Sequence, residues 1–158
     1  MPSSVLRHTP TRTAPAFPVY PLAAPALKRA CPEDPVLVPL QCLRPTQGAV
    51  GMKAVAAKRE KVERRTDSRK AITRYLEKRP IPAVRGPGND FYIIDHHHLS
   101  MALHQSEVTE AFVRVIGDLS RLPREEFWRR MAERGCLHLY AHHGQSIHPS
   151  ALPAAIPH

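Results

Sequence analysis

The spacing of apolar residues in the first half of the chain predicts one strand followed by two helices. Residues 36–43, VLVPLQCL, form a short β-prone run, and proline and glycine in the segment after it mark a turn. Residues 50–65 carry apolar side chains at helical spacing with basic residues between them. A second helix follows, which Asp67 or Ser68 caps and which Pro80 ends because proline cannot continue a helix.

The second half of the chain predicts a hairpin, two helices and two further strands. The turn sequence GPGND separates the two arms of the hairpin. On the strand that follows, Phe112 and either Val113 or Val115 face the core. The expected elements are, in chain order, strands over residues 81–85 and 91–95, a helix from about His97, a strand over 110–118, a helix over 122–135 and a strand over 136–140.

This order of elements predicts one small α+β domain over residues 35–141. Seven of the 17 prolines fall in residues 1–34, which have no periodic pattern, so this segment is predicted to be a disordered leader. Residues 142–158 also lack a period and are predicted to form an irregular tail. Within the domain the expectation is a short mixed sheet with helices packed on it.

The cysteines and the longest apolar runs bear on where the protein acts. No stretch approaches the roughly 20 apolar residues that a membrane-spanning helix needs. The 3 cysteines are far apart and form no C-x-x-C pair, which is typical of buried thiols in a reducing compartment. We therefore expect a cytoplasmic protein that does not engage a membrane.

The charge of the chain is concentrated in the two predicted N-terminal helices. The formal net charge is +9, and residues 50–79 carry 11 Lys and Arg against 4 Asp and Glu, a net +7. Such a surface attracts phosphates of nucleic acid or nucleotides, although a solvated helix face accounts for the same pattern. The segment has one aromatic residue, Tyr75, which gives little support to base stacking there.

The junction FYIIDHHHLSMAL places three histidines where a strand gives way to a helix. Free N–H groups at a helix start favour an anion, and histidines in the first turn donate to phosphate or move protons near neutral pH. One hypothesis is therefore an anion or nucleotide site at which His97 and His98 contribute their side chains. The alternative is that Asp95 caps the helix and one histidine packs inward against a backbone partner.

A metal site is a weaker interpretation of the same residues. Asp95, His97 and His98 could combine with His138 or His142 to supply nitrogen and oxygen ligands. Neighbouring histidines on one turn diverge, however, and the chain has no H-E-x-x-H pattern, so no metal ligand is assigned. The sequence also lacks a G-x-S-x-G nucleophile motif, a P-loop and a G-x-G-x-x-G loop.

Four segments together resemble the ParB-like nuclease family of the ParB/sulfiredoxin superfamily. They are LRPTQGAVGMKAVAAK, YLEKRPIPAV, GPGNDFYIIDHHHLSMAL and EEFWRRM, and the resemblance covers roughly residues 36–140. It implies a small α+β fold in which a strand-turn-helix motif of the type D-G-H-H-R cradles phosphate. Neither the reactive cysteine of sulfiredoxins nor the helix-turn-helix domain of partition proteins has a counterpart in this chain.

Matched position by position, the resemblance assigns the catalytic roles to Asp95, His97 and His98. The chain departs from the motif at two positions. His96 stands where glycine is common, and Leu99 stands where many relatives carry the phosphate-binding arginine. The residues expected to bind phosphate or nucleic acid in its place are Arg44, Gln47, Lys58, Arg85 and His96.

Two functions follow from these expectations. The first is a ParB-like nuclease or nucleotide-phosphate-handling domain that acts at the DHHH turn, with DNA or a nucleotide as its partner. The second is a non-catalytic basic module that binds nucleic acid or an acidic protein. The sequence leaves open whether a divalent metal ion or a nucleotide serves as cofactor, and which oligomeric state the protein adopts.

Overall fold

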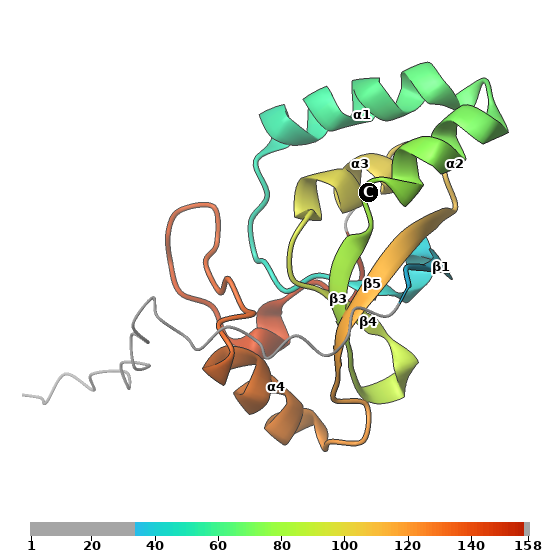
Figure 1. Ribbon diagram of the computed structural model, residues 1–158. Coiled ribbons are helices and arrows are strands. Elements are labelled where there is room, and N and C mark those ends of the chain that lie inside the picture. Colours follow the sequence, from blue (N-terminus) through green and yellow to red (C-terminus); the bar gives the residue numbers. More distant parts are fainter. Residues whose placement is uncertain (1–33, 157–158) are drawn as a thin grey trace, which may run out of the picture.

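A mixed five-stranded sheet lies between two layers of helices in the computed structural model, which describes residues 34–156 (Figure 1). The predicted leader lies outside the described residues except for Asp34. The α+β fold expected from the sequence is confirmed. The strands are β1 (Val36–Pro39), β2 (Leu43–Arg44), β3 (Ile81–Arg85), β4 (Phe91–Ile93) and β5 (Glu110–Asp118). The helices are α1 (Met52–Thr66), α2 (Arg69–Glu77), α3 (His97–His104) and α4 (Arg124–Glu133).

The strands are ordered β1-β5-β3-β4-β2 across the sheet. The predicted hairpin between β3 and β4 is confirmed, with Val84 opposite Tyr92 in an antiparallel pair. Its turn is closed by the Gly86 N–H, which donates to the Asp90 carbonyl at 2.9 Å, and Gly88 within it has a φ of 79°. β5 runs antiparallel to β1 and parallel to β3, while β2 runs parallel to β4.

Side chains alternate between the two faces of the sheet along each strand, and this produces two hydrophobic cores, one on each face. Ala83 and Ile93 point toward α1, α2 and α3, which cover one face (Figure 1). Val84 and Tyr92 point to the opposite face, where α4 packs. There the ring of Tyr92 lies 4.5 Å from the ring of Phe127, centroid to centroid. Both faces are covered, so the central strands are buried on both sides.

Helices α1 and α3 pack together over the sheet. Val55 and Val62, on one face of α1, are fully buried, as are Ala102 and Leu103 of α3. The N-cap of α2 is Ser68, one of the two caps that the sequence left open, and its Oγ accepts from the N–H of a residue in the first turn. None of the helices within residues 34–156 is long and apolar enough to cross a membrane.

Two of the expected strands differ from the structure. The run at residues 36–43 is interrupted after β1 by a 3-10 turn, Leu40–Cys42, which bends the chain before β2 begins. The strand expected at residues 136–140 is absent from the sheet. This segment instead runs beside the β2–α1 loop, where His138 forms an isolated bridge with Gln47.

The buried face of β5 consists of Ala111, Val113 and Val115. Phe112, which was expected to face the core, is only partly buried and packs against this cluster. The segment predicted to be an irregular tail contains a short 3-10 turn, Pro149–Ala151.

Candidate functional site

The turn between β4 and α3 is held by its own polar groups. The Asp95 side chain is exposed, and its Oδ1 accepts from the His96 N–H at 2.6 Å. His96 has a φ of 63°, so the position where relatives commonly carry glycine is a left-handed one. The first intrahelical bond of α3 runs from the Ser100 N–H to the His96 carbonyl at 2.9 Å. His96 rather than Asp95 is therefore the N-cap residue, and no side chain caps this helix.

His97 points inward and is 4% exposed. The Thr46 N–H donates to its Nε2 at 3.4 Å, while the Thr46 hydroxyl donates to the Ile93 carbonyl at 2.6 Å. Nε2 is therefore the acceptor, and the neutral ring carries its proton on Nδ1. Burial first, and then the nearby His138, lower the pKa of His97 from its ordinary 6.5 to about 4. The ring is neutral at physiological pH and joins the β2–α1 loop to α3.

The helices α1 and α3 begin on the same side of the molecule (Figure 1), and His98 is the second residue of α3. A Cβ placed on Gly51, the N-cap of α1, would lie 3.7 Å from the His98 Nε2. Neither helix has a side-chain cap or an acidic residue in its first turn. The positive ends of two helices without side-chain caps therefore lie beside one imidazole, and the Asp95 carboxylate directly precedes the second of them.

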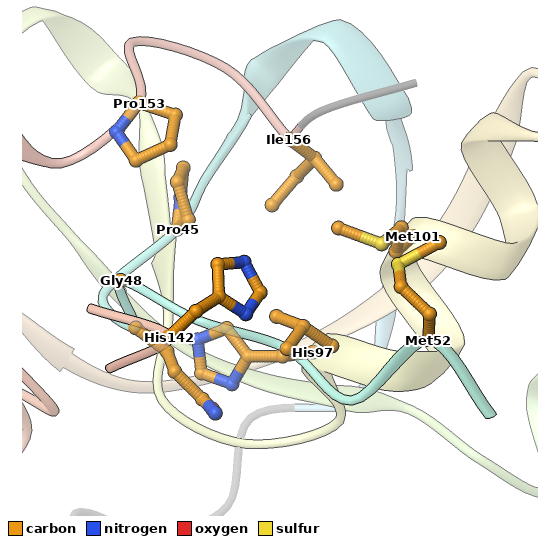
Figure 2. Close-up of a pocket in the computed structure, with 10 residues that line it drawn as sticks. Pro45, Gly48, Met52, His97, Met101, His142, Pro153 and Ile156 are labelled. Carbon is orange, nitrogen blue, oxygen red and sulfur yellow. The ribbon is translucent and has the colours of Figure 1, made fainter. Parts of the chain in front are cut away.

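A cavity of about 210 Å³ adjoins these helix ends. Figure 2 shows the imidazoles of His97 and His142 within it, with Met52 and Met101 on one side. Ile156 is 3% exposed and forms part of the wall, although it belongs to the segment predicted to be an irregular tail. The full lining is Pro45, Gln47, Gly48, Val50, Met52, His97, Met101, His142, Pro153 and Ile156.

The structure brings some of the expected phosphate ligands together at this site and leaves others away from it. Gln47 lines the cavity, and His96 lies in the turn, where its Nδ1 is buried without a hydrogen-bond partner among residues 34–156. Lys58 lies farther along α1 and is half-buried. The two expected arginines, Arg44 and Arg85, lie elsewhere.

Arg44 and Arg85 lie toward the other end of β4. The Arg44 Nε donates to the Asp90 Oδ2 at 3.0 Å, and this ion pair holds the guanidinium on the hairpin turn. The Arg85 guanidinium lies 5.5 Å from the centroid of the Phe91 ring, at the start of β4. The histidine turn follows the opposite end of that strand, so the structure does not bring these two arginines together with the histidines.

A second cavity of about 310 Å³ also adjoins the β2–α1 loop, and its lining shares Gln47 with the first. It is otherwise lined by Ala49, His138, Tyr140 and Ala141. Within residues 34–156, no three His, Cys, Asp or Glu side chains are grouped in a way that could hold a metal ion.

The sequence missed three residues that shape the site. Thr46 and Gly51 lie in the RPTQ-x-x-VGM segment that contributes to the family resemblance, so that motif marked the right stretch of chain without giving either residue a role. Ile156 belongs to a segment without a periodic pattern, so nothing in the sequence assigned this buried residue to the site.

A mixed sheet with a strand-turn-helix junction, placed beside the start of a second helix, defines a small α+β domain. The family model described as "Putative ParB-like nuclease" matches residues 36–158, and the chain belongs to this family. No curated protein matched the chain.

Among solved structures, the chain is similar to the crystal structure of protein Atu1540 from Agrobacterium tumefaciens. The two share 30% sequence identity with a TM-score of 0.69, and the match covers 79% of this chain. It covers 60% of that protein, so the chain spans well under two thirds of its length.

Proposed function

We propose that the protein binds a phosphate ester of nucleic acid or of a nucleotide where α1 and α3 begin, and that it hydrolyses the ester there as a ParB-like nuclease. The observation that carries this proposal is that two helix N-termini without side-chain caps lie near each other, because the His98 imidazole in the first turn of α3 lies beside Gly51, the N-cap of α1. The N–H groups that precede the first intrahelical bonds of both helices have no acceptor within their helix, and an anion satisfies such groups.

The basic surface of α1 supports the same ligand class. Two of its arginines are neutralised, Arg59 by Glu63 and Arg64 by Glu60. Its three lysines, Lys53, Lys58 and Lys61, form no ion pair within residues 34–156. A phosphate backbone that reaches the helix ends would meet this positive surface, which raises both its local concentration and its affinity.

The residues of the turn take different roles in this proposal. His98 donates a hydrogen bond to the phosphate and supplies a proton to the leaving oxygen. Asp95 keeps one carboxylate oxygen on the His96 N–H, which leaves the other to accept a proton from the attacking water as its oxygen bonds to phosphorus. His97 positions the turn through its hydrogen bond with Thr46 and does not itself become charged at neutral pH.

Cleavage and binding of labelled oligonucleotides test the proposal. The parent, Asp95→Asn and His98→Ala are compared on single- and double-stranded DNA, with and without a divalent metal ion. We expect Asp95→Asn to lose about 100-fold or more in turnover while binding is retained, because general acid–base groups contribute roughly that factor. His98→Ala should weaken binding about tenfold, because it loses a hydrogen bond to a charged group.

The matched control is His143→Ala, which removes an exposed histidine that lines neither cavity. This variant should cleave and bind like the parent. Equal turnover in Asp95→Asn, His98→Ala and His143→Ala would remove the turn from the mechanism.

The exposed basic residues of α1 and α2 favour a second candidate, a binding module without catalysis. This candidate predicts an affinity that falls steeply with salt concentration and no cleavage of any substrate under any metal condition. The absence of turnover in the parent, combined with salt-dependent binding, would select it over the nuclease.

A further inference from the structure

Tyr140 is a large aromatic residue that the structure leaves in solvent. It is 58% exposed, and its exposed fraction exceeds those of Val36, Leu37 and Met52, which are the other large hydrophobic residues exposed within residues 34–156. It lines the second cavity together with Gln47 and His138. An exposed aromatic ring beside polar groups and an open cavity of about 310 Å³ is suited to a flat, polar-edged ligand.

The backbone that carries Tyr140 is held in place. The Tyr140 N–H donates to the His138 carbonyl at 3.0 Å, and Tyr140 forms a bridge with Ser146. The β2–α1 loop packs against this segment so closely that a Cβ on Gly48 would lie 2.7 Å from the Tyr140 carbonyl oxygen. Glycine at position 48 permits this approach, so the ring stands on a backbone fixed to the same loop that leads into α1.

That loop also sets the distance between Tyr140 and the proposed phosphate site. Ala49 lines the Tyr140 cavity, and Gly51, two residues later, is the N-cap of α1. Two residues of extended chain span at most about 7 Å, so the cavity and the helix end are close neighbours. A nucleotide with its phosphate at Gly51 therefore has its base, or the adjacent base, within reach of Tyr140.

We infer that Tyr140 is a stacking platform for an unpaired base and that the substrate is single-stranded nucleic acid. This inference rests on the proposed function, whose phosphate site it extends by one base. A base in a duplex already has both faces stacked, so it offers none to an exposed ring, whereas every unpaired base has a free π face. Gln47 and His138 contact the edge of the stacked base.

The experiment measures the binding of fluorescein-labelled single strands by anisotropy. The parent is compared with Tyr140→Ala, Tyr140→Phe and His98→Ala on three probes of equal length: a single strand, the same strand with abasic sites, and the corresponding duplex. We expect Tyr140→Ala to bind the single strand roughly tenfold more weakly, since stacking of one base on an aromatic ring contributes at that level. Tyr140→Phe keeps the ring and should bind like the parent.

Two further readouts separate stacking from a loss of charge or of fold. Tyr140→Ala should leave the salt dependence of binding unchanged, because no phosphate contact is removed. It should also bind the abasic strand and the duplex as the parent does. A Tyr140→Ala variant that matches the parent on the single strand, or that loses affinity equally on the abasic strand, would overturn the inference.

The effects of His98→Ala and Tyr140→Ala on the three probes distinguish the phosphate site from the stacking platform. If His98→Ala weakens all three probes while Tyr140→Ala weakens none, the phosphate site stands and the stacking platform falls. If the parent binds none of the three probes, the phosphate site falls and the platform falls with it. If Tyr140→Ala weakens the single strand while His98→Ala binds like the parent, the platform stands and the phosphate has been placed at the wrong residues.

Discussion

At the residue scale, two adjacent histidines at the start of α3 occupy opposite environments. His97 is buried and accepts from the Thr46 N–H, whereas His98 is partly exposed beside Gly51. Consecutive residues on a helix point about 100° apart, so His97 faces the β2–α1 loop at Thr46 while His98 faces Gly51 at the start of α1. The sequence placed both in one site, but their spacing alone could not tell which would be buried, because that depends on Thr46, far away in the chain.

His97 should make the protein sensitive to acid. Its folded pKa of about 4 lies below its ordinary 6.5, so the unfolded chain binds the proton more tightly. The free energy of unfolding is therefore undiminished by His97 above pH 6.5, and it decreases as the pH falls toward 4. We expect the loss to reach about 3 kcal/mol, measured as the difference in the free energy of urea-induced unfolding between pH 7 and low pH.

His97→Gln is the matched variant, because the glutamine carbonyl can accept from the Thr46 N–H without taking up a proton. Its unfolding free energy should fall less between the two pH values than that of the parent. His143→Gln, at an exposed position, should follow the parent. An identical fall in His97→Gln and the parent would show that His97 is not the source of the acid sensitivity.

At the element scale, the helices were easier to predict than the strands. Helical spacing and caps are local, and α1, α2, α3 and α4 all lie where the sequence indicated. The apolar content of residues 36–43 predicts one strand, because it does not reveal the turn at Leu40–Cys42. The run at residues 136–140 has strand-like composition, but its pairing partner is the loop at Gln47 rather than the sheet.

Ser68 is a cap whose contribution can be measured. Its Oγ accepts from the Ala71 N–H at 3.3 Å at the start of α2. Ser68→Ala should lower the free energy of unfolding by about 1 kcal/mol, because that N–H loses its partner. Ser68→Asp restores an acceptor at the positive end of the helix and should match or exceed the parent in thermal unfolding. A Ser68→Ala protein as stable as the parent would mean that the cap contributes nothing.

At the scale of the whole molecule, the candidate site is built from three parts of the chain that lie far apart. The loop before α1 supplies Thr46 and Gln47, the β4–α3 turn supplies His97, and the segment after α4 supplies His142 and Ile156. The first two parts are marked by motifs in the sequence. The third carries no motif, and only the tertiary packing brings it to the cavity.

Ile156 should contribute measurably to stability. It is 3% exposed and packs in the core cluster that includes α1 and α3. Ile156→Ala should lower the free energy of unfolding by about 2–4 kcal/mol and enlarge the cavity, since a large aliphatic side chain is removed from a packed wall. Ile156→Val, the matched control, should cost about 1 kcal/mol. An Ile156→Ala protein within 0.5 kcal/mol of the parent, about the limit for surface substitutions, would mean that this segment is not docked in solution.

The late position of the third segment has a consequence for biosynthesis. A ribosome releases α1, β4 and α3 well before the residues that carry Tyr140, His142 and Ile156. Contacts between distant parts of a chain form only after both parts have emerged. A nascent chain therefore exposes the two helix ends without the platform or the outer wall of the cavity. On the proposed arrangement, the affinity for a single strand should therefore rise in two stages, first when α1 and α3 have folded and again when the segment through residue 156 has left the ribosome.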